Sequence, residues 1–322
     1  MTEEINVIGT GTMGRGIALS FATAGFKVKL HDSSLESIDK GLDYIDKSLD
    51  LMIECGLFNN IRKKEILKNI YAEKNFEKSI KNASVIIESI PEDLKMKQKL
   101  FQRIELINNN FNMICSNTSR FPLKKLIQKS QFKERYLITH YFNPAEIIPL
   151  VEVVKGKYTD EKVVDIVLTL LKKANKSPVL IEKEINGFIG NRLQAALLRE
   201  AISLIEAGVA TPEDIDNIVK NGLGFRWAFL GPIEICEFGG WDIWMEVVKN
   251  LFPSLDNRGD VPNIINKLLE ENRLGIKTNY GLFKYSEKEA VSKILKRDKS
   301  FLEFLKLRER ILIKEANREN IN

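Results

Sequence analysis

The stretch Ile5-Asn6-Val7-Ile8-Gly9-Thr10-Gly11-Thr12-Met13-Gly14 decides the fold, because it joins a short apolar run to a glycine pattern and opens a helical stretch, 15–24. In this context the glycines predict a dinucleotide site. Gly9 permits a tight turn, Gly11 lets the backbone approach a pyrophosphate, and Gly14 allows the helix to pack closely on the strand. The helix N-terminus then faces the phosphates. The residues predicted to contact the cofactor here are Gly9, Gly11, Thr12, Met13 and Gly14. An ordinary glycine-rich turn is the alternative.

Asp32 follows the second β-rich run, Lys27–His31. A carboxylate about 20 residues beyond the glycines can accept hydrogen bonds from the adenosine ribose hydroxyls. Because Ser33 and Ser34 follow it and bring no arginine for a 2′-phosphate, the sequence predicts NAD and not NADP. The alternative is that Asp32 caps the next helix.

The rest of the first half alternates β-rich runs with amphipathic helical stretches, the pattern of a parallel sheet with helical crossovers. A long charged stretch, 35–69, is interrupted at Cys55-Gly56 and predicts a helical hairpin inserted in the sheet domain. Beyond Asn186-Gly187 the periodicity is helical throughout. We therefore expect a doubly wound α/β domain of the Rossmann type over 1–185 and an all-α domain over 186–322. The β-rich runs are 5–8, 27–31, 85–88, 113–115, 137–139, 149–154 and 178–182.

Composition limits the class of protein. The chain has 322 residues, and its formal charge of +5 comes from 49 basic and 44 acidic side chains spread along it, which does not indicate nucleic acid as a partner. Cys55, Cys115 and Cys236 are far apart and lack metal-ligand spacing, so we expect reduced thiols, no metal and a cytoplasmic location. No stretch approaches the roughly 20 apolar residues of a membrane span.

His140 is the candidate proton-transferring residue. The other of the two histidines, His31, adjoins Asp32, whereas His140 ends a β-rich run at the carboxyl edge of the sheet, where ligands bind. Glu152 lies in an otherwise apolar strand and is costly to bury unless it is paired. A His140–Glu152 pair would let the free ring nitrogen take a hydroxyl proton while hydride leaves the same carbon. The alternatives are a structural histidine and an exposed Glu152.

Five motifs in order resemble the L-3-hydroxyacyl-CoA dehydrogenase superfamily over nearly the whole chain. They are 9–14, Glu88-Ser89-Ile90-Pro91-Glu92, Ser116-Asn117-Thr118-Ser119, His140-Tyr141-Phe142-Asn143-Pro144 and Asn186-Gly187-Phe188-Ile189-Gly190-Asn191-Arg192. The resemblance implies NAD as cofactor, a catalytic His140–Glu152 dyad, and a substrate oxygen held beside His140 by Ser119 and Asn191. It also implies that four residues help to place the nicotinamide half of NAD: Glu92, Lys97, Asn143 and Lys277. From the residues alone, Ser119 could instead cap a helix, and Asn191 could be solvated.

The sequence resembles two branches of the superfamily, and these branches act on different substrates. The 140–144 block and 277–283 look like the hydroxybutyryl-CoA branch, whereas the stretch 222–232 and other segments look like the branch of gulonate dehydrogenase, carnitine dehydrogenase and lambda-crystallin, which acts on free hydroxy acids. The family's CoA-contacting serine falls on Ser48, but the lysine expected seven residues later falls on Cys55. Arg226 has a planar fork suited to a free carboxylate, or it pairs internally with Glu234 or Glu237.

On this balance the sequence predicts an NAD-dependent oxidation of a short-chain L-3-hydroxyacyl-CoA, such as 3-hydroxybutyryl-CoA, to the 3-ketoacyl-CoA. The alternatives are a dehydrogenase of a free 3-hydroxy acid and an NAD-binding crystallin-like protein without turnover. The presence of all four catalytic candidates speaks against the last. The resemblance also implies a homodimer, for which the sequence offers the apolar faces of the segment 195–207. The alternative is that these faces are internal core.

Overall fold

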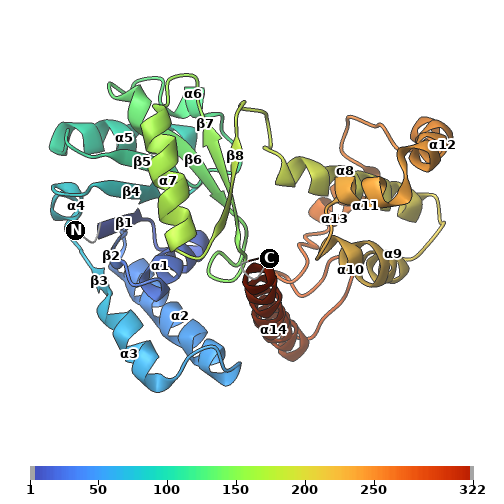
Figure 1. Cartoon of the computed structure of the whole chain (residues 1–322), viewed down its shortest axis with the longest axis horizontal. Helices are drawn as coiled ribbons and strands as arrows, with labels where there is room; N and C mark the ends of the chain where they lie inside the picture. Colours follow the sequence, from blue (N-terminus) through green and yellow to red (C-terminus); the bar gives the residue numbers. More distant parts are fainter. Residues whose placement is uncertain (1–3, 320–322) are drawn as a thin grey trace. The chain divides into compact units, whose positions relative to one another are not determined.

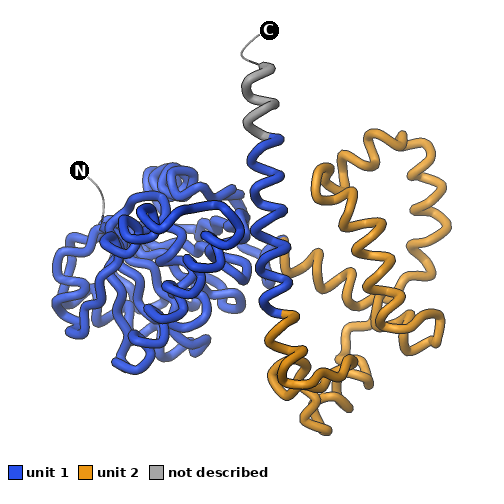
Figure 2. The backbone as a smooth tube through the Cα atoms, turned by 90° about the horizontal axis from the view of Figure 1, so that it is seen from below, with its two compact units in different colours: residues 1–189, 294–322 blue, residues 190–293 orange. Residues whose placement is uncertain are grey.

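The computed structural model describes residues 4–319, with side chains to 311. Its chain forms two compact units, drawn in different colours in Figure 2. Unit 1 comprises Met1–Ile189 and Ile294–Asn322, and unit 2 comprises Gly190–Lys293. No described helix is long and apolar enough to cross a membrane.

Unit 1 is built on an eight-stranded sheet in the order β3-β2-β1-β4-β5-β6-β7-β8. Neighbouring strands are parallel except β6 and β7, which pair antiparallel. A short connection, 142–149, joins these two strands, as an antiparallel pair permits. The strands are β1 (Glu4–Ile8), β2 (Lys27–His31), β3 (Ile70–Ala72), β4 (Val85–Glu88), β5 (Met113–Ser116), β6 (Tyr136–Tyr141), β7 (Leu150–Lys155) and β8 (Ser177–Ile181). The α/β prediction is confirmed. The sequence missed only β3, whose three residues carry little periodicity.

Helices cover both faces of this sheet (Figure 1). One apolar core lies between the sheet and α1, α2, α3 and α7, and a second lies between its other face and α5 and α6. The predicted helical hairpin is α2 and α3, which are separated at Gly56, a glycine with a φ of 73°. The helices are α1 (Thr12–Thr23), α2 (Leu35–Glu54), α3 (Asn60–Lys68), α4 (Phe76–Ile80), α5 (Leu94–Ile107), α6 (Leu123–Leu126), η1 (Lys133–Arg135) and α7 (Glu161–Lys173).

Unit 2 is helical, as predicted. Thr211 caps α9, because its side chain accepts a hydrogen bond from the Asp214 amide while Pro212 begins the helix. The elements are α8 (Gly190–Glu206), α9 (Pro212–Ile218), η2 (Val219–Leu223), α10 (Gly224–Trp227), α11 (Pro232–Gly239), α12 (Trp241–Leu251), η3 (Phe252–Ser254), α13 (Asn263–Glu270) and the start of α14 (Glu287–Glu319).

The later part of α14 belongs to unit 1, which differs from the predicted division into 1–185 and 186–322. Leu302 is 1% exposed within the core of unit 1. Lys299 Nζ lies 2.9 Å from Glu54 Oε2, and Lys306 Nζ donates to the carbonyl oxygen of Cys55. The amphipathic pattern of 294–311 predicts a helix with a buried face, but it does not say which apolar surface covers that face.

Candidate functional site

A cleft of about 840 Å³ opens in unit 1 at the carboxyl ends of β1, β4 and β5. In a doubly wound sheet this edge is where dinucleotides bind. The predicted site residues that line the cleft are Gly9, Gly11, Thr12, Met13, Asp32, Glu92 and Ser119. The structure therefore gathers most of the predicted cofactor residues of unit 1 in one cavity.

The glycines at the start of α1 fit a phosphate group. A Cβ on Gly14 would overlap the carbonyl oxygen of Gly9, and a Cβ on Gly9 would overlap Ser89, so the chain itself requires both glycines. At Gly11 a Cβ would meet nothing within 4 Å. Gly11 is also the N-cap of α1 and provides no side-chain acceptor for the first amides of the helix. The positive end of α1 can therefore receive an anion.

Asp32 is fixed at the rim of this cleft. Its Oδ2 accepts hydrogen bonds from the amide and the hydroxyl of Thr10, at 2.8 and 3.1 Å, and its Oδ1 accepts from the Ser34 amide at 3.1 Å. Ser34 is the N-cap of α2, where its side chain accepts from the Ser37 amide. The alternative in which Asp32 caps that helix is therefore wrong, and these hydrogen bonds hold the carboxylate at the rim of the cleft.

Two lining residues that the sequence did not single out are Phe76 and Arg103. The guanidinium carbon of Arg103 lies 4.2 Å from the centre of the Phe76 ring, and the His31 ring lies 5.3 Å from it on centres. The His31 and Phe76 rings are tilted by 55° to each other, so each of these planar groups offers its own face to an aromatic base. Phe76 and Arg103 are 27 positions apart in the chain and belong to no motif, so no sequence signal identifies them.

Behind the cleft, Lys97 forms a buried ion pair. Its Nζ lies 2.5 Å from Glu88 Oε1 and 3.2 Å from Glu92 Oε2, and both Lys97 and Glu88 are almost completely buried. Burial raises the pKa of the Glu88 carboxyl, while Lys97 opposes that shift. Lys97 is not among the residues lining the cleft, but it contacts two that are: Glu92 by the ion pair and the Ile90 carbonyl oxygen by a hydrogen bond of 3.3 Å. The sequence missed Glu88 as a network member, although a carboxylate ending an apolar strand was a usable signal.

The predicted dyad is formed in the structure. His140 and Glu152 face each other across the antiparallel pair β6–β7, and Nδ1 of His140 lies 2.7 Å from Oε2 of Glu152. Both residues are buried, so the alternative of an exposed Glu152 is wrong. The other carboxylate oxygen, Oε1, accepts from the Ile189 amide at 2.9 Å. A carboxylate at Nδ1 fixes the neutral tautomer whose Nε2 is an acceptor.

Asn117 connects this dyad to the cleft. It lines the cleft, and its Oδ1 accepts a hydrogen bond of 3.2 Å from the amide of Tyr141, the residue after His140. Ser119 lies two positions further and is exposed. Because the N-cap of α6 is Pro122, the alternative in which Ser119 caps a helix is wrong. Asn143 is exposed just beyond β6.

Three other predicted residues lie in unit 2. Asn191 is half-buried in the first turn of α8, and Lys277 is exposed in the segment before α14. Arg226 is exposed on α10. The suggested acceptors for Arg226 have other donors, since Glu234 accepts from the Gly231 amide and Glu237 from Trp241. Among the side chains described, Arg226 forms no ion pair, so that alternative is wrong.

Ser48, the proposed CoA contact, is half-buried on α2 and hydrogen-bonds the Tyr44 hydroxyl. Tyr44 in turn donates to Glu146 Oε1 at 2.6 Å, and burial raises its pKa. Ser48 thus has a role within unit 1 that requires no ligand.

Comparison with known proteins is consistent with this geometry. Residues 4–185 match the family described as 3-hydroxyacyl-CoA dehydrogenase, NAD binding domain, and residues 187–285 match its C-terminal domain. The helix α14 lies beyond both matches.

Relatives on both sides of the substrate question are similar to this chain. The 5-formyl-3-hydroxy-2-methylpyridine 4-carboxylate 5-dehydrogenase of Mesorhizobium japonicum is 30% identical over 90% of this chain and 93% of its own. The 3-hydroxybutyryl-CoA dehydrogenase of Clostridioides difficile is 30% identical over 88% of this chain and 100% of its own. A solved structure of the pyridine carboxylate enzyme, described as an NAD⁺ dependent dismutase, superposes with a TM-score of 0.87 at 28% identity, over 94% of this chain and 97% of that one. The chain therefore belongs to the 3-hydroxyacyl-CoA dehydrogenase family, and its unit 1 carries the NAD-binding domain of that family.

Proposed function

We propose that this NAD-dependent dehydrogenase oxidises the secondary alcohol of a 3-hydroxy compound to a ketone. The His140–Glu152 pair beside the cofactor cleft carries the proposal. NAD supplies the hydride acceptor. His140 takes the hydroxyl proton at Nε2, because Nδ1 is already hydrogen-bonded to Glu152. As the ring becomes positively charged, the buried carboxylate 2.7 Å away stabilises it. Ser119 and Asn191 are the proposed donors to the substrate oxygen.

For the substrate, the packing of α14 favours a small free hydroxy acid over the acyl-CoA that the sequence motifs favour. The family's CoA-binding lysine corresponds to Cys55, which is buried and 8% exposed. Its carbonyl oxygen accepts from Lys306, and its neighbour Glu54 pairs with Lys299, both on α14. A helix therefore covers the hairpin end at which that lysine would contact CoA. Arg226, exposed and free of ion pairs in the described chain, is the proposed partner for a free carboxylate.

The acyl-CoA reading remains the second candidate, since the chain matches the whole length of the Clostridioides enzyme. One experiment separates the two. Rates of NADH oxidation with acetoacetyl-CoA are set beside rates of NAD reduction with 3-hydroxybutyrate, L-gulonate and L-carnitine. The proposal requires a free acid to exceed the CoA thioester at least tenfold in kcat/KM, and Arg226→Ala to remove that advantage. A tenfold preference for acetoacetyl-CoA would reverse the assignment. Absence of turnover with every substrate would favour the crystallin-like role.

We also propose that the chain forms a homodimer through unit 2. On α8 alone, Leu193 is 60% and Leu198 53% exposed, and α11 and α12 expose further large apolar side chains. Exposed large apolar side chains on three helices of one unit support an interaction site there. Light scattering at micromolar concentration should give about twice the mass of 36.8 kDa, and a monomer mass would refute the dimer.

A further inference from the structure

Lys176 is a buried lysine that the catalytic proposal does not use. It lies between α7 and β8 and is only 8% exposed. Its Nζ donates to the carbonyl oxygens of Ala145 and Ile148, at 2.5 and 3.1 Å. Among the described residues it forms no ion pair within 4 Å, and burial lowers its pKa to about 8. Burying a cation without a counter-ion has a free-energy cost, which hydrogen bonds to the ammonium offset in part.

Both carbonyls belong to one connection, 142–149, which links the two members of the dyad. His140 is the second-last residue of β6, before this connection, and Glu152 is the third residue of β7, after it. The same connection contains Asn143. Lys176 therefore contacts the segment that joins the two strands carrying the dyad.

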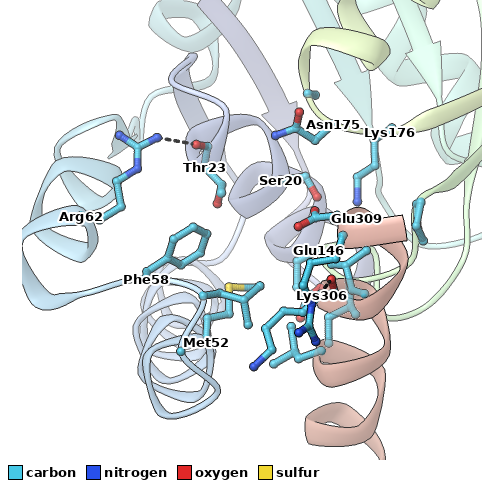
Figure 3. Close-up of a pocket in the computed structure, with 18 residues that line it drawn as sticks. Ser20, Thr23, Met52, Phe58, Arg62, Glu146, Asn175, Lys176, Lys306 and Glu309 are labelled. Carbon is cyan, nitrogen blue, oxygen red and sulfur yellow. Dashed lines mark hydrogen bonds between the residues drawn. The ribbon is translucent and has the colours of Figure 1, made fainter. Parts of the chain in front are cut away.

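Further contacts hold this connection from other elements. Ser20 on α1 donates to the Ala145 carbonyl oxygen at 3.1 Å, and Glu146 accepts from Tyr44 on α2. Figure 3 shows Lys176 pointing toward Ser20 and Glu146 in the wall of a cleft of about 660 Å³. Glu146 is also the charged group that opposes the lowering of the Lys176 pKa. Of these residues, Lys176 is the one that donates hydrogen bonds to two carbonyl oxygens of the connection.

We propose that Lys176 is a positioning residue for the His140–Glu152 dyad. The inference rests on the proposed function, because it acts through that dyad. The ammonium ties the start of β8 to the connection, so that β6 and β7 keep the register in which the imidazole and the carboxylate meet. Small displacements of catalytic groups have large effects on the chemical step and small effects on cofactor binding.

The test compares Lys176→Met, which keeps the length of the side chain and loses its donors, with Lys172→Met, a matched change at an exposed lysine of α7. We expect Lys176→Met to lower kcat about 10- to 100-fold and to leave the KM for NAD within about twofold. The pH at which kcat reaches half its maximum should also move, since a displaced Glu152 no longer supports the imidazolium. Lys176→Arg should restore part of the rate, and Lys172→Met should change neither kcat nor the profile. A folded Lys176→Met enzyme with normal kcat and pH profile would overturn the inference.

Two further measurements keep the inference testable. If Lys176→Met does not fold, Ser20→Ala removes one donor to the Ala145 carbonyl and should lower kcat in the same direction, and an unchanged kcat refutes the role of the connection. If the wild type turns over no 3-hydroxy substrate, the proposed function fails, but amide hydrogen exchange still tests the anchoring. The amides of Ile147 and Ile148, which donate to Pro144, should exchange faster in Lys176→Met than in Lys172→Met. Equal exchange would refute the anchoring.

Discussion

Nδ1 of His140 lies 2.7 Å from Oε2 of Glu152 on the neighbouring strand. Because Glu152 is held at its other oxygen by the Ile189 amide, the ring is fixed with Nδ1 toward Glu152 and Nε2 away from it. We expect His140→Gln to lower kcat by about 10² to 10⁴, while the Kd for NAD, measured by fluorescence titration, changes little. A kcat close to that of the wild type would exclude His140 as the base.

Cofactor choice should depend on Asp32. Its carboxylate is oriented by Thr10 and Ser34 at the rim of the cleft, where a 2′-phosphate would meet a negative charge. Replacing Asp32 by alanine should lower kcat/KM for NAD and raise the relative use of NADP. Initial rates with the two cofactors measure the ratio, and Asp39→Ala, at an exposed carboxylate of α2 that does not line the cleft, is the control. A wild type that already prefers NADP would contradict this use of the carboxylate.

The buried pair of Glu88 and Lys97 should dominate the stability of the cleft wall. Lys97→Met removes the cation that lies 2.5 Å from Glu88 and should cost about 3–5 kcal/mol of unfolding free energy, because a buried carboxylate is left uncompensated. The double variant Glu88→Gln/Lys97→Met should be more stable than Lys97→Met alone. Urea titrations report both values, and a Lys97→Met protein as stable as the wild type would show that the pair is unimportant.

Lys176 should make stability depend on pH in a defined direction. Burial lowers its pKa from the ordinary 10.5 to about 8, so between pH 8 and 10.5 the unfolded chain binds a proton that the folded chain does not. The free energy of unfolding therefore gains a contribution that grows with pH across this window, on the order of 3 kcal/mol at most. The unfolding free energies of the wild type and of Lys176→Met are measured by urea titration from pH 7 to 10. Their difference separates the contribution of Lys176 from those of the other titrating groups. A flat or falling difference would be evidence against the lowered pKa.

The contact of α14 with unit 1 can be tested by truncating its core residue. Leu302 is 1% exposed, and Leu302→Ala should destabilise unit 1 by about 2–5 kcal/mol. Leu307→Ala, at a residue that is 41% exposed on the same helix, should cost much less. Equal losses in the two variants would mean that α14 does not complete that core.

Sequence patterns predicted the features of the site that depend on short stretches of the chain. The glycines that begin α1 are required by contacts within about 80 residues, with Ser89 as the far partner of Gly9, and the strand–turn–helix pattern contains that information. The dyad was predictable because a carboxylate in an apolar strand needs a partner and the chain has only one suitable histidine.

Other parts depend on contacts that no pattern encodes. Phe76 and Arg103 meet only after α4 and α5 are placed around the sheet. In the sequence, nothing distinguishes Lys176 from other lysines between a helix and a strand. Its contact with the connection 142–149 exists only in the folded protein. The placement of α14 on Cys55 joins residues 251 positions apart, and an amphipathic helix can cover any apolar surface of matching size.

The return of α14 to unit 1 also affects the order of events during synthesis. When the first 189 residues have left the ribosome, the sheet and its crossover helices are complete in sequence, but the apolar surface that Leu302 covers in the finished protein has no cover yet. More than 100 further residues must be translated before that helix arrives, which takes several seconds at the usual elongation rates. During that interval the nascent chain exposes the apolar surface around Met52 and Leu57, which lines the same cleft as Leu302 in the finished protein.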